Sequence, residues 1–299
     1  MIVLIGVMRS SIFVAVTTTQ GIGKNGDSIF RCPSVIHLLS SRKSFISRRH
    51  AMKLTGNTIL ITGGGAGIGR GLAEALHKLG NQVIIAGRRK AALDETTSAN
   101  PGMKSIELDI TNPESVTSVA RQLIETYPAL NVLINNAGIM HIDDLSAPVD
   151  DAMMVSTLTT NLMGPIRMTG ALVEHLQKQN DAAILNVSSV LGFVPMAIAG
   201  VYSSTKAAMH SYTQSLRYKL KDTTVRVIEI APPWVQTDLL NSRNEPRAMP
   251  LAPFIEQTMH ELGTDADEAL VEIARPMRNN AGPNEAAFVT QFNDMFAEG

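Results

Sequence analysis

Cysteine is nearly absent from this sequence of 299 residues, which contains Cys32 alone. A single cysteine forms neither a disulfide within the chain nor a cysteine-ligated metal site. We therefore expect a reducing, cytoplasmic environment. Histidine offers no metal site either, because the spacing of the seven histidines is not that of metal ligands. They are His37, His50, His77, His141, His175, His210 and His260.

Long apolar runs are missing as well. Arg9 interrupts the apolar start "MIVLIGVMRSSIFVAV" before the ~20 residues that span a bilayer, so we expect no transmembrane helix and no membrane partner. Basic charge is scarce over most of the chain, since residues 52–299 hold 19 Lys/Arg against 26 Asp/Glu. Phosphate backbones require a clustered basic surface, so we expect no nucleic-acid partner.

Basic residues are instead concentrated in residues 1–51, where seven Lys/Arg and eight serines accompany one acidic residue, Asp27. We favour disorder or a start-site artefact for this leader, because "MKLTGNTILITGG" begins at Met52, directly before the first strong strand pattern. A targeting segment and an ordered function stay open. We take residues 52–299 as the domain, with a variable substrate-loop region from about residue 239.

Six short runs rich in β-branched residues alternate with helical patterns from Thr55 onward. The runs are apolar on both faces, as strands packed between helices should be. This alternation predicts a single α/β domain with a Rossmann-like, doubly wound parallel sheet and helices on both faces. The tail from Leu239 has weaker periodicity, which predicts a loop and short helices. The strands are expected at 57–62, 82–87, 105–110, 131–136, 182–189 and 226–232.

A glycine-rich turn, "TGGGAGIG", follows the first predicted strand and opens the first helix. Glycines there let the backbone approach a pyrophosphate, while the helix N-terminus supplies unpaired N–H groups. The next strand ends at Arg88 and Arg89, where an NAD site usually has an acidic residue, so NADP(H) is favoured and NAD(H) stays open. A solvated basic turn is the alternative, since Lys90 follows. The predicted dinucleotide site contains Thr62, Gly63, Gly65, Gly67, Ile68, Gly69, Arg88 and Arg89.

Tyr202 and Lys206, in "YSSTKAAMHSYTQSLRYKL", lie four positions apart and would project from one face of a helix. Such pairs arise by chance on many helices. Here, however, "NNAG" and "NVSS" each end a predicted strand upstream, and a dinucleotide site is already expected. We therefore interpret the pair as catalytic. The sequence has no Gly-x-Ser-x-Gly elbow, which disfavours a serine hydrolase.

The four motifs "TGGGAGIG", "NNAG", a strand-end serine and "YSSTK" stand in the order typical of the short-chain dehydrogenase/reductase family, which residues 55 to about 240 resemble. "INNAGI", "VYSSTKAA" and "APPWV" are most similar to the branch named for D-alanine esterification of teichoic acids, a name that says little about the substrate. The resemblance implies an NAD(P)-dependent oxidoreductase that interconverts a small-molecule carbonyl and a secondary alcohol. An NADP(H)-binding sensor or scaffold without turnover and a sugar epimerase are the alternatives.

The resemblance also implies roles for individual residues. Tyr202 would be the general acid/base and Lys206 its electrostatic partner and ribose anchor. Ser189, rather than Ser188, would polarise the substrate oxygen, and Asn161 would hold a proton-relay water. Tyr202 and Lys206 would share the cofactor site with Asp109 at the adenine edge, Ile110, Asn136, Ala137, Gly138, Pro232, Val235 and Thr237.

Simple electrostatics suggests how such a pair would work. A tyrosine with a pKa near 10 is about 0.1% ionised at pH 7. A lysine cation at ~4–6 Å, together with the positive nicotinamide of an oxidised cofactor, favours the phenolate. We therefore expect the pKa of Tyr202 to be lowered toward the operating pH.

Two features depart from the family pattern. Pro233 stands where the family usually has glycine, so Pro233 and Trp234 should stiffen the loop after the sixth strand. The Asp-Gly-Gly ending that accompanies a seventh strand in many members is missing, although a homodimer through the helices of Asn161 and Tyr202, or a homotetramer, is implied by the resemblance. An apolar carbonyl pocket or ordinary packing would account for Met140, Phe193, Met196, Trp234, Leu239 and Leu240 after strand ends.

Overall fold

The computed structural model describes residues 2–8, 11–17 and 51–297, which fall into two units, residues 1–46 and residues 47–299. In the first unit, β1 (Ile2–Met8) and β2 (Ser11–Thr17) pair antiparallel, with Ile2 opposite Thr17. Residues 18–50 of the leader lie outside the described residues, so our expectation for the leader stays a prediction.

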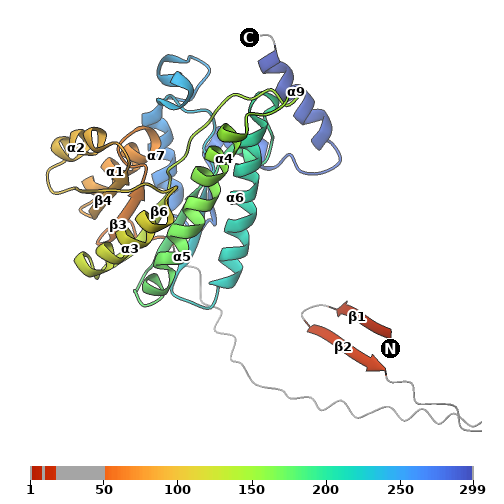
Figure 1. The fold of residues 1–299 in the computed structure, drawn as a ribbon, viewed down its shortest axis with the longest axis horizontal. Coiled ribbons are helices and arrows are strands. Elements are labelled where there is room, and N and C mark those ends of the chain that lie inside the picture. The colour runs from red at the N-terminus through yellow and green to blue at the C-terminus, as the bar shows by residue number, and fades with distance from the viewer. Residues whose placement is uncertain (1, 9–10, 18–50, 298–299) are drawn as a thin grey trace, which may run out of the picture. The chain divides into compact units, whose positions relative to one another are not determined.

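The second unit is built on one parallel sheet with helices on both faces, which confirms the predicted fold class (Figure 1). Its strands lie in the order β5–β4–β3–β6–β7–β8–β9. The chain crosses over after β5, so the carboxyl ends of β3 and β6 flank the switch point at which such sheets bind ligands. The strands are β3 Thr58–Thr62, β4 Gln82–Gly87, β5 Lys104–Glu107, β6 Leu130–Asn135, β7 Ala183–Val187, β8 Arg226–Ile230 and β9 Glu268–Ala269.

Capping residues mark the ends of some of the helices. Asn112 accepts hydrogen bonds from the N–H groups of Glu114 and Ser115 at the start of α3, and Pro113 occupies its first position. Gly80, with a φ of 83°, follows the end of α1. The helices are α1 Gly67–Lys78, α2 Lys90–Ala99, α3 Pro113–Thr126, α4 Asp151–Leu158, α5 Gly164–Leu176, α6 Gly200–Lys219, α7 Leu251–Leu262, α8 Arg275–Arg278 and α9 Glu285–Ala297.

The hydrophobic core forms two layers, one on each face of the sheet. Ile59 and Ile61 of β3 pack in the layer that contains Leu72 of α1 and Phe254 of α7. Leu60, between them in sequence, packs in the layer formed with α3 and α5. Successive residues of a strand point to opposite faces, so a strand buried on both faces is apolar throughout, as the sequence predicted.

The tail beyond residue 239 contains more regular structure than the sequence indicated. A seventh strand, β9, pairs with β8, with Glu229 opposite Glu268, although the family's usual ending is missing. Helices α7 and α9 have 12 and 13 residues, so they are not the short helices we expected. In the described part of the chain, no helix has both the length and the apolar character needed to cross a membrane.

Candidate active site

The predicted site residues follow the carboxyl ends of neighbouring strands. The glycine-rich turn comes after β3, Asn136–Gly138 after β6, Ser189 after β7 and Pro232 after β8. Because the strands are parallel, these ends meet along one edge of the sheet. The 20-residue helix α6 supplies Tyr202 and Lys206.

Tyr202 and Lys206 lie four residues apart near the start of α6 and both are buried, with exposed fractions of 7% and 4%. The Nζ atom of Lys206 lies 5.4 Å from the centroid of the Tyr202 ring. The same ammonium donates a hydrogen bond of 2.9 Å to the carbonyl of Val187, the last residue of β7. The helix and the strand end therefore hold a cation beside the phenol.

Ser189 and Ser188 occupy different surroundings. Ser189 Oγ accepts a hydrogen bond from the N–H of Leu191 at 3.1 Å and donates one to the carbonyl of Pro232 at 3.5 Å. The Ser189 side chain also acts on the phenol of Tyr202, where it works to lower the pKa. Ser188 instead donates to the carboxylate of Glu229 at 2.5 Å. Of the two serines, Ser189 is therefore the one that lies beside the phenol.

The ionisation of the pair differs from our expectation. Burial raises the pKa of Tyr202 to about 12, and the side chain of Ser189 acts in the opposite direction. Burial also lowers the pKa of Lys206 to about 8, which the negative charge of Glu229 opposes. Both charged forms lose hydration in this closed site, so the expected lowering of the tyrosine pKa is not found. At neutral pH, Tyr202 is a phenol and Lys206 is mostly an ammonium.

Asn161 lies in a π-helical turn, Thr159–Met163, between α4 and α5. Its amide makes two hydrogen bonds of 2.8 Å to the backbone of Ile139, accepting from the N–H and donating to the carbonyl. Its Nδ2 also lies 3.3 Å from Thr205 Oγ1 on α6. Wide turns of this type recur at functional sites. Asn161 thus fixes the segment after Gly138 beside the helix of the tyrosine.

Of two glycines at this junction, Gly138 has room for a side-chain carbon and Gly192 does not. A Cβ on Gly138 would lie 3.4 Å from Asn161 Oδ1 and 3.8 Å from Lys206 Nζ. A Cβ on Gly192 would lie 2.8 Å from the backbone oxygen of Lys206, which is too close. The contact at Gly192 explains why the turn after Ser189 contains glycine.

The glycine-rich turn is held against the loop that follows β6. Thr62 Oγ1 accepts hydrogen bonds from the N–H groups of Asn136 and Ala137, at 3.0 and 3.1 Å. In return, Asn136 Nδ2 donates to the carbonyls of Thr62 and Gly63. A Cβ on Gly69 would lie 2.3 Å from Asn136 Nδ2. The side chains of Thr62 and Asn136 therefore shape the turn.

The first turn of α1 faces the loop after β8. Gly67 opens the helix with a φ of 51°, and Ala66 before it has no side-chain group that could cap the helix. A Cβ on Gly67 would lie 3.3 Å from Cβ of Thr237, which places this threonine at the helix N-terminus. Val235 is buried behind it and bridges to Met249, while the Pro232 carbonyl accepts from the N–H of Val190. Gly65 and Ile68 are half-buried in the same turn.

Arg88 and Arg89 follow β4 with exposed side chains, and neither forms an ion pair within the described part of the chain. Lys90, by contrast, pairs with Asp94. After β5, the Asp109 carboxylate accepts from the N–H and hydroxyl of Thr111, at 2.9 and 2.6 Å. These bonds lower the pKa of Asp109, and Arg88 contributes in the same direction. Ile110, next in the chain, is buried against Gly164.

The apolar residues expected around a carbonyl pocket differ in how far they are buried. Met140, Phe193 and Met196 pack against the core layer that contains Tyr202, whereas Leu239 and Leu240 remain 40% and 38% exposed. Trp234 donates from its indole N–H to Ser242 at 2.7 Å, which closes the loop after β8 on itself.

Helix α9 lies in the region from residue 239 that was expected to contain the substrate loop, but the contacts of its side chains were not predicted. Asn293 accepts from the N–H of Ala197 and donates to the carbonyl of Pro195, holding the loop that follows Ser189. Phe296 lies 6.1 Å from Trp234, measured between ring centroids. The pattern "FVTQFNDMF" was a weak signal of this helix.

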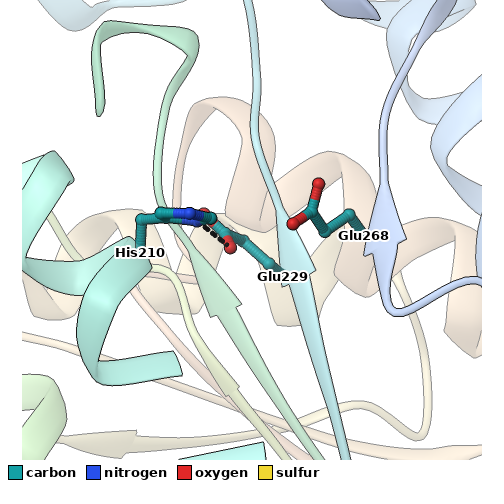
Figure 2. Close-up of side chains that lie close together, drawn as sticks. All are labelled: His210, Glu229 and Glu268. Atoms are coloured by element: carbon teal, nitrogen blue, oxygen red, sulfur yellow. Dashed lines mark hydrogen bonds and ion pairs between the residues drawn. The ribbon is translucent and has the colours of Figure 1, made fainter. Parts of the chain in front are cut away.

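A second group of ionisable residues, also missed, lies next to the catalytic candidates. His210 Nδ1 of α6 is hydrogen-bonded to the carboxylate of Glu229 of β8 at 2.7 Å, and Glu268 projects beside them from β9 (Figure 2). Such a group resembles metal ligands in composition. Its carboxylates already have protein partners, however, because Glu229 accepts from Ser188 and Glu268 pairs with Arg278.

The sequence comparisons identify the family. The family model for short chain dehydrogenases matches residues 57–248. The uncharacterized oxidoreductase DltE of Bacillus subtilis (strain 168) is 42% identical over 189 residues, which are 63% of this chain and 75% of that protein. An uncharacterized oxidoreductase of Staphylococcus aureus (strain USA300) is 31% identical over 67% of this chain and 87% of that protein. The chain therefore belongs to the short-chain dehydrogenase/reductase family.

Solved structures agree with this assignment. A short chain dehydrogenase from Burkholderia cenocepacia J2315, in complex with NADP, superposes with a TM-score of 0.71 over 80% of this chain and 98% of that chain, at 28% identity. A 3-ketoacyl-(acyl-carrier-protein) reductase from Brucella melitensis, complexed with NADH, gives 0.65 over 71% and 92%, at 25% identity. The neighbours thus contain both forms of the cofactor.

Proposed function

We propose that this oxidoreductase uses NADP(H) to interconvert a carbonyl and a secondary alcohol through Ser189, Tyr202 and Lys206. The observation that carries the proposal is the convergence of these three side chains at the edge of the sheet where the glycine-rich turn lies. A buried phenol between a hydroxyl and an ammonium is suited to move one proton to or from a substrate oxygen.

The residues around the turn fit a nicotinamide dinucleotide. The first turn of α1 offers N–H groups without a side-chain cap, and Gly63 and Gly67 have positive φ angles that bring the backbone close to a ligand. Thr237 would contact the phosphates and Asp109 the adenine end. When bound, the nicotinamide supplies or accepts the hydride, and the protein supplies position and electrostatics.

In the reducing direction, Tyr202 would donate its proton to the substrate oxygen as negative charge develops there. The raised pKa of Tyr202 keeps the phenol protonated before the reaction, which suits a proton donor. Ser189 would donate a hydrogen bond to the same oxygen, and Lys206 would stabilise the phenolate that remains. These interactions strengthen as charge forms, so they stabilise the transition state more than the bound substrate.

Preference for NADP(H) is supported by the ends of β4 and β5. Arg88 and Arg89 are exposed and free of ion pairs within the described residues, whereas the neighbouring Lys90 is paired. Two guanidinium groups at this position could bind a 2′-phosphate in a bidentate manner. Asp109, the nearby acid, already accepts two hydrogen bonds from Thr111.

The test is a fluorescence titration of the full chain with NADPH and NADH, followed by a panel of ketones and aldehydes while absorbance of the reduced cofactor is recorded. We expect tighter binding of NADPH and its consumption with at least one carbonyl. Tight binding without consumption across a broad panel would favour a sensor, a scaffold or an epimerase that recycles its cofactor.

A further inference from the structure

Helix α6 carries a row of four polar side chains at intervals of four residues, of which the proposed mechanism uses the first two. After Tyr202 and Lys206 come His210 and Gln214. His210 Nδ1 lies 2.7 Å from Glu229 Oε2, and His210 Nε2 lies 2.7 Å from Gln214 Nε2. One face of the helix therefore connects the catalytic pair to a buried carboxylate and then to the surface.

Glu229 is the unusual member of this group. Its side chain is fully buried in β8, the strand next to the edge strand β9. A carboxylate without water is costly unless it is paired and hydrogen-bonded. Glu229 has both kinds of partner, because His210 contacts one of its oxygens and the Ser188 hydroxyl donates to the other at 2.5 Å.

The segment Val187–Ser189, at the end of β7, links the Glu229 carboxylate to the catalytic pair. Three consecutive residues there make three different contacts: the Val187 carbonyl accepts from Lys206, the Ser188 hydroxyl donates to Glu229, and the Ser189 side chain acts on the phenol of Tyr202. The bond from Ser188 thus anchors the centre of a segment whose two neighbours contact the catalytic pair.

Glu229 lies among several charged groups, and its negative charge also favours the ammonium form of Lys206, acting to raise the pKa of that lysine. Among the neighbours, the carboxylate of Glu268 on β9 accepts two hydrogen bonds of 2.7 and 2.9 Å from Arg278 of α8. Arg217 of α6 donates to the carbonyls of Val227 and Asp267. Arg278 and His210 also interact electrostatically with this acidic pair.

We propose that Glu229 and His210 are positioning residues: through Ser188 they fix the segment Val187–Ser189, and with it the Val187 carbonyl that holds the ammonium of Lys206 beside Tyr202. The proposal rests on the proposed function for its effect on turnover, but the link between Glu229 and Lys206 is a property of the protein without cofactor. It can therefore be tested separately.

The first test measures the free energy of unfolding of the cofactor-free full chain from pH 6 to 11. Lys206→Met serves as the reference, since subtracting its curve isolates the titration of Lys206. The wild-type difference should change between about pH 8 and pH 10.5, the pKa values of Lys206 in the folded and unfolded states. In Glu229→Gln, measured against Glu229→Gln with Lys206→Met, the lower limit should move down by about one pH unit, because the stabilising charge is gone.

Glu268→Gln is the matched control, because it removes a second carboxylate from the same group, one that is bonded to Arg278 and not to Ser188. We expect its curve to follow that of the wild type. A Glu229→Gln curve that coincides with the wild type would overturn the proposal, even if the protein proves to be an active reductase.

The second test follows turnover. In Glu229→Gln, the alkaline limb of kcat/KM should move down by about one pH unit, whereas Glu229→Asp, which retains the charge, should keep the limb and lower kcat. If Glu229→Gln fails to fold, Ser188→Ala tests the proposal instead. In that variant kcat should fall about tenfold, and the pH of the alkaline limb of kcat/KM should not change. An unchanged kcat in Ser188→Ala, or a uniform loss in Glu229→Gln with no shift of the limb, would leave Glu229 only a structural role.

Discussion

The two sides of the site are held together by different kinds of interaction. On the turn side, residues 62–69 and 136–138, the contacts join backbone groups to Thr62 and Asn136, and glycines let the turn pack closely against its neighbours. On the charge side, residues 187–189 with Tyr202, Lys206, His210 and Glu229, three of the four ionisable side chains are buried, and that of His210 is partly exposed. The turn side depends on shape and the charge side on electrostatics, so the two should fail in different ways when altered.

The largest effect is expected on the charge side. Tyr202→Phe removes the proton donor and should lower kcat by about 10²–10⁴-fold. The dissociation constant for NADPH should stay within about threefold, because the turn side is untouched. Steady-state kinetics and a fluorescence titration measure the two quantities, and survival of wild-type turnover would refute the role of Tyr202.

On the turn side, the sharpest change is Gly69→Ala. The added Cβ would meet Asn136 Nδ2 at 2.3 Å and the Gly63 carbonyl at 2.4 Å, so the turn must open. We expect a loss of about 3 kcal/mol in the free energy of unfolding, with weaker cofactor binding. Gly170→Ala on α5 is the control, because nothing lies within 4 Å of the new methyl group. It should be neutral or stabilise by up to about 1 kcal/mol, and equal losses in both variants would contradict the argument.

The preference for NADP(H) is tested by Arg88→Ala. Loss of a charge-assisted contact should weaken NADPH binding by about 1.5–3 kcal/mol and leave NADH binding nearly unchanged. Lys90→Ala, which removes a paired cation two residues further on, should affect neither ligand. Equal weakening of NADPH and NADH in Arg88→Ala would rule out a contact with the 2′-phosphate.

The variant Lys206→Met measures how much the buried charge of Lys206 lowers the free energy of unfolding. Burial holds the folded-state pKa of Lys206 at about 8, below its usual 10.5, so the protonated lysine destabilises the fold below pH 8. This penalty disappears as the pH rises from 8 to 10.5. We expect Lys206→Met to unfold at a free energy about 1–2 kcal/mol higher at pH 7, after the lost hydrogen bond to Val187 is allowed for, while turnover is lost. Urea denaturation at pH 7 and pH 10.5 checks this, and a gain that grows with pH would contradict it.

The smallest effect concerns the leader. A chain that begins at Met52 keeps the buried Met52 side chain and all residues of both sides of the site. Its free energy of unfolding and its kcat/KM should match those of the full chain within about 0.5 kcal/mol. A clear loss of either would assign the leader a role in the domain.

The sequence was informative where function depends on local pattern. The apolar runs located six strands to within three residues, because strands buried on both faces have an unmistakable composition. Tyr202 and Lys206 were singled out by helical spacing together with the motifs upstream, and Ser189 by the resemblance to the family. The glycine-rich turn was equally clear, since its residues lie together in the chain.

Features that depend on distant partners were not predictable. Glu229 is a single polar letter in the strand "RVIEI", and its partner His210 lies 19 positions away in another element. The two-residue strand β9 is too short to show any periodicity. The raised pKa of Tyr202 in the protein without cofactor was not predictable either, because it depends on burial, which follows only from the packed structure.

The hydrogen bonds of Asn293 also bear on the order in which the two sides of the site form while the chain is being translated. Asn136, the partner of Thr62, is synthesised 74 residues after it. Asn293, the partner of Ala197, is synthesised 96 residues after Ala197. Because folding during translation proceeds from the N-terminal end, a nascent chain would gain its dinucleotide turn well before its substrate side is closed. Arrested chains that end shortly before α9 should therefore bind cofactor while leaving the loop after Ser189 open to proteases.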